Sequence, residues 1–164
     1  MLSKTIQDAL NEQIKNEMFS SYLYLSMSAY CAESSLPGFA SWMRVQSGEE
    51  QTHAMKFFSY ILERNSHVEL QALVKPQSKF KSPMELFKHV LDHEKKVTGM
   101  INALYELAVK EKDYPTQIML EWFITEQLEE EKTAGEIIQL LTMVGENGPA
   151  LLMLDRQLAA RAAK

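Results

Sequence analysis

A Glu–His pair lies inside the apolar stripe of a long helical pattern. Glu50 and His53 are three residues apart, which places them on one face of a helix, one turn apart. Phe57 and Ile61 continue that face at helical spacing, so it is the face that packs into a core. A carboxylate buried there is costly unless a cation pairs with it. The pair therefore indicates a metal site, and Glu-x-x-His is a known spacing of metal ligands in helical bundles.

Other polar residues on core-facing stripes repeat this arrangement. Glu17 precedes Glu50 by thirty-three residues, and Glu94 precedes Gln127 by the same interval. Glu130 follows Gln127 at the spacing of the Glu–His pair. The chain thus contains two similar half-sites, which an antiparallel bundle can bring to one depth. Four carboxylates and one imidazole suit two divalent ions with open coordination positions, and this ligand set favours iron over calcium or copper.

Glu50 lies in the middle of this set and is expected to bridge the two ions. Each remaining carboxylate, and the imidazole, then completes the coordination of one ion. The expected partners are Glu17 and His53 for the first ion and Glu94 and Glu130 for the second.

Polar neighbours of this set have other expected roles. Gln127 is neutral and is expected to bond an oxygen between the ions rather than hold a metal tightly. Tyr24 lies two turns after Glu17 on the same face. It is either a core tyrosine bonded to a carboxylate or a residue with a redox or hydrogen-bonding role at the site. Three further carboxylates flank the set and form either a solvated acidic face or another cation site: Glu49, Glu126 and Glu129.

Apolar periodicity predicts an all-α fold, a four-helix bundle with a short fifth C-terminal helix. The eighteen residues 65–82 exceed the usual link of about 2 to 8 residues between neighbouring helices. They are therefore expected to cross along the bundle, with antiparallel helices on either side. We expect a single domain over residues 1–164, with the main bundle at about 3–144. The expected helices are about 3–31, 37–64, 83–112, 115–144 and 150–161.

Bulk composition excludes several classes of protein. The 164 residues suffice for one domain, and a net charge of −5 without a basic run argues against nucleic acid as a partner. The single cysteine, Cys31, excludes an internal disulfide and a C-x-x-C metal site. No stretch approaches the roughly 18 apolar residues of a membrane span, and the N-terminus lacks the features of a secretory signal. A cytoplasmic location is expected, without a membrane partner.

The sequence resembles the bacterial non-haem ferritins over essentially its whole length. The resemblance rests on several short motifs that include the two half-sites. They are Glu17 with residues 20–25, residues 49–54, His93-Glu94, residues 113–116, and Trp122 followed by residues 126–132.

The resemblance implies a homo-oligomer, a hollow shell of twenty-four subunits. Each subunit would oxidise Fe(II) with dioxygen or peroxide at a di-iron centre, and Fe(III) mineral would be stored inside. By the same resemblance, Tyr24 and Trp122 are aromatic neighbours of the centre. The implied iron ligands are Glu17, Glu50 and His53 for the first iron, Glu50, Glu94 and Glu130 with Gln127 beside them for the second, and Glu49, Glu126, Glu129 and Glu130 for a third.

Some positions depart from related patterns. Gln117 and Leu120 stand where animal ferritins place acidic residues of the three-fold channel, which leaves only Glu121 nearby. Gln51 replaces the haem-ligating Met of bacterioferritins, so no haem is expected. His93 is expected to be a surface or interface histidine.

Two other functions are alternatives. The first is a di-iron oxidase or peroxide-detoxifying protein of similar fold without bulk storage. The second is a metal-free helical bundle with a buried hydrogen-bond network, which is costly if its polar groups are only partly satisfied.

Overall fold

Four long helices and one short helix form the structure, a computed structural model in which residues 1–161 are described. Within that range there is no β-strand, so the expected all-α four-helix bundle with a fifth helix is confirmed. None of these helices combines the length and apolar composition needed to cross a bilayer. The helices are α1 (Lys4–Glu33), α2 (Pro37–Glu63), α3 (Pro83–Lys110), α4 (Tyr114–Val144) and α5 (Gly148–Ala159).

Polar side chains cap the N-termini of three long helices. Ser3 accepts a hydrogen bond from the Ile6 N–H at 3.2 Å at the start of α1. Ser82 plays the same part for α3, and Asp113 for α4. Each cap satisfies a backbone N–H that has no partner inside its helix and contributes about 1 kcal/mol. These caps explain why the helices begin where the sequence indicates.

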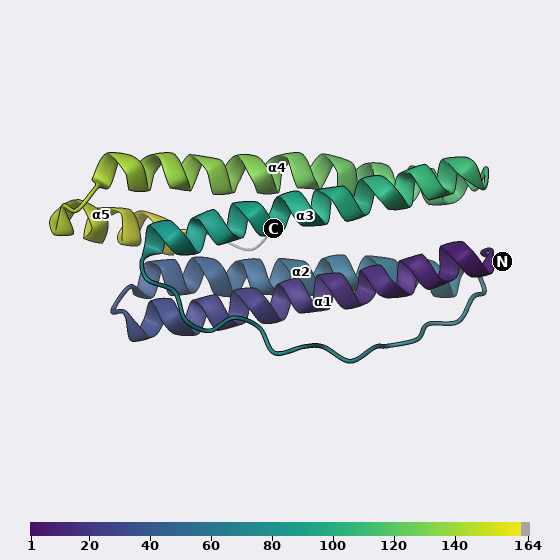
Figure 1. Ribbon diagram of the computed structural model, residues 1–164, viewed down its shortest axis with the longest axis horizontal. Helices are drawn as coiled ribbons and strands as arrows, with labels where there is room; N and C mark the ends of the chain where they lie inside the picture. The colour runs from purple at the N-terminus through teal and green to yellow at the C-terminus, as the bar shows by residue number, and fades with distance from the viewer. Residues whose placement is uncertain (162–164) are drawn as a thin grey trace.

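A long connection joins the two antiparallel helix pairs. Figure 1 shows α1 beside α2 and α3 beside α4. Residues 64–82 run along the outside of the bundle from the end of α2 to the start of α3. Hydrogen bonds from α1 hold this connection in place. The Asn11 side chain donates to the His67 carbonyl at 3.0 Å and accepts from the Glu69 N–H at 2.9 Å. Ser26 donates to the Gln77 carbonyl at 2.8 Å. The expected crossover is therefore confirmed.

The apolar interior is divided into two clusters along the bundle axis. On α1, residues 6–14 supply one cluster and residues 23–31 supply the other, with Glu17 between them. On α2 the order is reversed, because the helix runs in the opposite direction. Polar residues fill the same level on all four long helices, and they form one layer between the two clusters. Its members are Glu17, Gln46, Glu50, His53, Glu94, Gln127 and Glu130.

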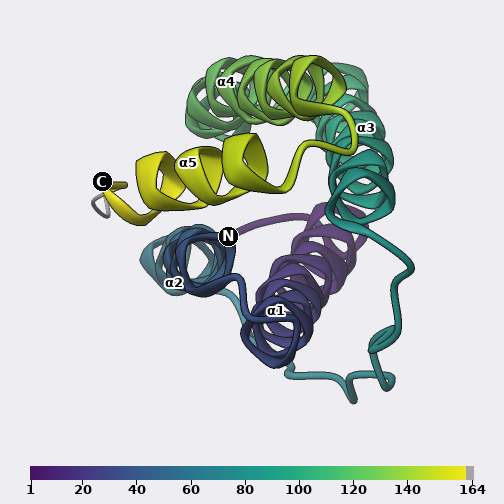
Figure 2. The ribbon, with the colours of Figure 1, turned by 90° about the vertical axis from the view of Figure 1, so that its left-hand side faces the viewer.

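The short helix α5 lies across one end of the bundle. Figure 2 shows it between α4 and α2. It begins two residues earlier than expected, because Asn147 accepts a hydrogen bond from the Ala150 N–H at 3.0 Å and caps the helix. Asp155 of α5 accepts from the Phe39 N–H at 2.9 Å. A Cβ at Gly38 would lie 1.7 Å from the Asp155 carbonyl oxygen, so α5 and α2 approach closely only because residue 38 is glycine.

Candidate metal centre

Three side chains on α1 and α2 converge in the polar layer. Glu17, Glu50 and His53 are buried and offer one ligand atom each, and these atoms lie within 4.8 Å of one another. His53 Nδ1 lies 3.2 Å from Glu50 Oε2, as the one-turn spacing requires. Gln13, one turn before Glu17, donates to Glu17 Oε1 at 2.7 Å and fixes that carboxylate. This half of the expected site is assembled as the helical spacing indicated.

The other half is formed by α3 and α4. The Tyr24 hydroxyl donates to Glu94 Oε1. The Gln127 side-chain amide donates to Glu94 Oε2 at 3.1 Å and to the Glu94 carbonyl at 3.2 Å. Gln127 therefore orients the Glu94 carboxylate. The bond from Tyr24 to Glu94 agrees with the prediction of a core tyrosine bonded to a carboxylate.

Gln46 connects the two halves. Its side-chain amide donates to Glu50 Oε1 at 3.0 Å and to Glu130 Oε2 at 2.8 Å. Gln46 is not among the residues that the sequence predicted for the site. It lies one turn before Glu50, so the first contact follows from helical spacing, whereas the contact with Glu130 depends on the packing of α2 against α4.

Several buried oxygen atoms of the centre have no hydrogen-bond partner within residues 1–161. They are Glu17 Oε2, Gln46 Oε1 and Glu130 Oε1. Buried polar atoms are normally bonded, and a carboxylate oxygen without a donor loses its solvation without compensation. Buried oxygen atoms without donors suit a cation, so the donor set fits divalent metal ions.

Burial also changes the protonation of the carboxyl groups. Burial and the neighbouring Glu50 raise the pKa of Glu17 to about 8. Burial raises the pKa of Glu94 to about 7, and burial together with Glu94 raises that of Glu130 to about 7. The pKa of Glu50 is also raised well above its ordinary value by burial and by Glu94 and Glu130. Without metal, the centre therefore retains protons at neutral pH that a bound cation would replace.

His93, expected to be a surface or interface histidine, packs partly inside the single chain. It is half-buried, and its Nε2 lies 2.8 Å from the Ser20 hydroxyl oxygen. Its ring also meets the Tyr24 ring edge-on, with the centroids 5.9 Å apart. Burial lowers the pKa of His93 to about 4, so the imidazole is neutral at physiological pH. His93 is adjacent to Glu94 in sequence, so helical spacing predicts that it points away from the proposed metal ligands. This spacing does not predict its packing against α1.

The flanking carboxylates lie beside the centre with different exposures. Glu49 is buried, Glu126 is 9% exposed and Glu129 is exposed. His53, Glu126 and Glu130 offer ligand atoms within 4.8 Å of one another, which joins this cluster to the centre. Arg161, which no sequence pattern had singled out, donates to Glu49 at 2.5 Å.

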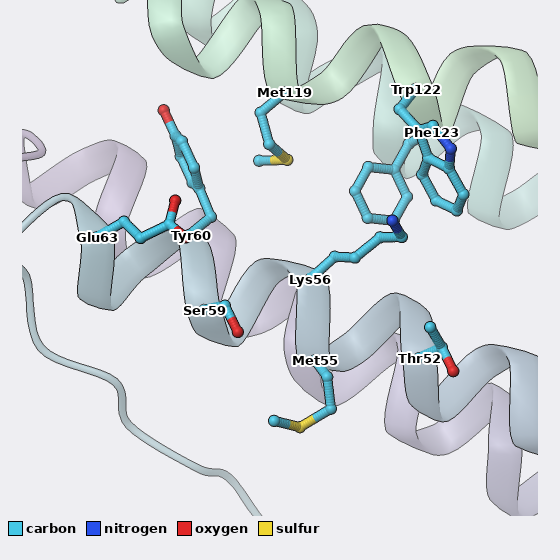
Figure 3. Close-up of a pocket in the computed structure, with 9 residues that line it drawn as sticks. All are labelled: Thr52, Met55, Lys56, Ser59, Tyr60, Glu63, Met119, Trp122 and Phe123. Atoms are coloured by element: carbon cyan, nitrogen blue, oxygen red, sulfur yellow. The ribbon is translucent and has the colours of Figure 1, made fainter.

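A groove between α2 and α4 leads to this region. Its volume is about 470 Å³, and Figure 3 shows Lys56 extending across it toward Trp122 and Phe123. The Lys56 ammonium lies 4.0 Å from the centre of the Trp122 ring, and that ring packs edge-on against His53 at 5.4 Å. A smaller pocket of about 200 Å³ shares Lys56 and Trp122 and is lined by Glu49, His53 and Glu126. The groove thus reaches the edge of the centre from the α2–α4 side.

The fold and the site define a helical-bundle protein with a carboxylate-rich centre suited to divalent metal ions. Comparison with known proteins agrees, because a family model described as a ferritin-like domain matches residues 7–144. The chain belongs to the ferritin family, and iron storage is the function that this membership supports.

Named relatives are similar over almost the whole chain. A bacterial non-heme ferritin of Campylobacter jejuni is 41% identical over 156 residues, covering 95% of this chain and 93% of the relative. One of Staphylococcus aureus is 40% identical over 161 residues, covering 98% and 97%. Among solved structures, an open pore ferritin of the archaeon Archaeoglobus fulgidus aligns with a TM-score of 0.98 and 45% identity over 99% of both chains. A humanized archaeal ferritin aligns with a TM-score of 0.99 and 44% identity, covering 100% of this chain and 99% of the other.

Proposed function

We propose that this iron-storage protein is a ferroxidase, which binds Fe(II) at a two-iron centre and oxidises it with dioxygen or peroxide. The observation that carries this proposal is the polar layer between the two apolar clusters. It contains four buried carboxylates and one imidazole, with oxygen atoms that lack donors among the described residues. Such a layer is expensive in the metal-free state and gains its compensating charge from the iron substrate.

The side chains divide between two iron positions around Glu50. His53 and Gln46 contact opposite oxygens of Glu50, which holds that carboxylate between the two halves. A bridging carboxylate lowers the repulsion between two cations, which in two-metal sites are about 3.5–4 Å apart. The proposed ligands are Glu17, Glu50 and His53 for the first iron and Glu50, Glu94 and Glu130 for the second, with Gln127 beside the second.

Tyr24 supports the second position. Burial and the nearby Glu94 raise the pKa of Tyr24 well above its ordinary value, so its hydroxyl remains protonated. Its hydrogen bond to Glu94 orients that carboxylate, and a phenol in contact with an iron ligand can also supply an electron and a proton. We assign Tyr24 both parts in the oxidation.

The flanking carboxylates form a third cation position in this proposal. Glu126 shares a ligand-sized space with His53 and Glu130, so a cation there would be linked to the centre through Glu130. Glu49 lines the same small pocket as Glu126. The position would hold iron that enters or leaves the two-iron centre, and its full set is Glu49, Glu126, Glu129 and Glu130.

Storage requires a closed assembly, and we propose a shell of twenty-four copies in the cytoplasm. A single chain leaves large apolar side chains exposed on several elements, such as Leu70 on the crossover, Ile118 on α4 and Met153 on α5. Contacts between copies would bury such residues. Family membership supports the same architecture, with the mineral held inside the shell.

Aerobic loading with Fe(II) tests the proposal. The expected result is rapid oxidation followed by retention of far more iron than two ions per chain, measured as the iron-to-protein ratio after gel filtration. A ratio of two would instead favour an oxidase without bulk storage, and a ratio of zero would favour a metal-free bundle. Glu50→Ala should lose the rapid phase, whereas Glu33→Ala, which removes an exposed carboxylate of α1, should retain it.

A further inference from the structure

Arg161 lies against Glu49, one of the flanking carboxylates, just after the end of α5. Its guanidinium donates from Nη2 to Glu49 Oε2 at 2.5 Å. The same group lies over the Trp42 ring, with Cζ 4.3 Å from the ring centre. Its side chain is only 18% exposed, and Nη1 is buried without a hydrogen-bond partner within residues 1–161. A charged group is thus largely removed from solvent at the edge of the metal centre.

The guanidinium pairs with a carboxylate that a cation at the flanking position would also use. Glu49 is one of the proposed ligands of that position, and Arg161 engages one of its oxygens. Because an arginine cannot lose its proton in a protein, its charge opposes any metal ion bound nearby for as long as it stays there.

We propose that Arg161 is a built-in counter-cation, which pairs with Glu49 in the iron-free protein and is displaced when a metal ion binds to the flanking carboxylates. It would thereby set the affinity of the third cation position relative to the two-iron centre. The inference rests on the proposed third position and adds a residue that determines its occupancy.

The position of Arg161 in the chain permits such a displacement. The last helical residue of α5 is Ala159, and the Arg161 N–H bonds to the nearby Leu158 carbonyl at 3.2 Å. The anchor of α5 lies earlier, where Asp155 meets the start of α2. Rotation of the Arg161 side chain can therefore release Glu49 while α5 keeps its place. A purely structural role, in which the ion pair only holds the chain end, predicts no effect on metal binding.

Zinc titration of the assembled, metal-free protein separates the two roles. Zn²⁺ is a divalent probe that is not oxidised, and calorimetry gives the number and affinity of sites. Arg161→Gln should raise the Zn²⁺ affinity of the weakest site by roughly fivefold, which is the change expected when one competing ion pair is removed. Arg156→Gln removes the same charge from an exposed position on α5 and should leave the affinity unchanged. Arg161→Lys keeps the charge and should bind Zn²⁺ more weakly than Arg161→Gln.

Fluorescence gives an independent readout of displacement. The chain has two tryptophans, so Trp122→Phe leaves Trp42 as the only one. Its emission should change at the Zn²⁺ equivalent that fills the third position, and the change should be absent when Arg161 is also replaced by Gln.

Two results would overturn the inference in distinguishable ways. In the first, the weakest site has equal affinity in the wild type and Arg161→Gln, and crystals show a third Zn²⁺ beside an intact Arg161–Glu49 pair. Arg161 would then have only a structural role. Absence of a third Zn²⁺ from both proteins, with the two-iron centre filled, would instead refute the third position itself.

Discussion

Replacement of Glu17 by Gln should remove much of the pH dependence of stability in the metal-free protein. Burial and Glu50 raise the pKa of Glu17 in the folded protein to about 8, from an ordinary value of 4.5. The folded state therefore holds a proton that the unfolded chain has already released above about pH 5. Stability linked to this proton is present at low pH and is lost as pH rises through about 8.

The size of the effect follows from the two pKa values. Between pH 6.5 and 8.5, Glu17 alone should lower the free energy of unfolding by on the order of 2 kcal/mol. Glu50, Glu94 and Glu130, whose pKa values are also raised, should add a further loss as pH rises. Glu17→Gln should keep that further loss and remove only the share of Glu17, because Gln has no proton to release and preserves the shape of the side chain.

Urea unfolding of chelator-treated protein at pH 6.5, 7.5 and 8.5 measures the difference. Glu33→Gln, an exposed change on the same helix, is the matched control and should follow the wild type. Saturating Zn²⁺ should reverse the trend, because metal binding requires deprotonated carboxylates and becomes stronger as pH rises. If the wild type and Glu17→Gln lost equal stability across this range, Glu17 would not hold the proton and the reasoning would be wrong.

Three further perturbations address oxidation, packing and the flanking position. Glu50→Ala should abolish rapid Fe(II) oxidation in stopped-flow absorbance more completely than Gln127→Ala, because Glu50 alone is placed to bridge both irons; equal rates would contradict the bridge. Gly38→Ala should lower the free energy of unfolding by about 1–3 kcal/mol in denaturant titrations, since its Cβ would overlap the Asp155 backbone. Gly48→Ala, with open space around it, should raise that free energy by about 0.5–1 kcal/mol, and equal effects would refute the close approach. Glu49, Glu126 and Glu129 can be replaced together by Gln. Oxygen-electrode measurements should then show an unchanged first phase of two irons per chain, followed by altered oxygen consumption per iron. An unchanged ratio of oxygen to iron would favour a solvated acidic face.

Much of the fold and the centre could be predicted from local periodicity. Glu17 and Glu50 interrupt apolar stripes, and residues on a core-facing stripe must enter the interior whatever the details of packing. The crossover followed from the length of residues 65–82. These features depend on spacing along one helix or on chain length, both of which are visible in a sequence.

Contacts between distant segments could not be predicted in this way. The Gln46–Glu130 bond depends on how α2 faces α4, and the Arg161–Glu49 pair joins residues 112 positions apart. His93 was expected at the surface or an interface, whereas Ser20 on α1 supplies a partner within the same chain. Helical periodicity describes one element at a time, and these three residues acquire their surroundings from a second element.

The bond between Asp155 and the start of α2 also constrains the order in which the molecule can be completed. Leu36 offers α2 no side-chain cap, and the acceptor for the Phe39 N–H comes from 116 residues later in the chain. On the ribosome, all four long helices are synthesised before that acceptor exists. The first turn of α2 therefore stays uncapped in the nascent chain and is completed only when α5 emerges.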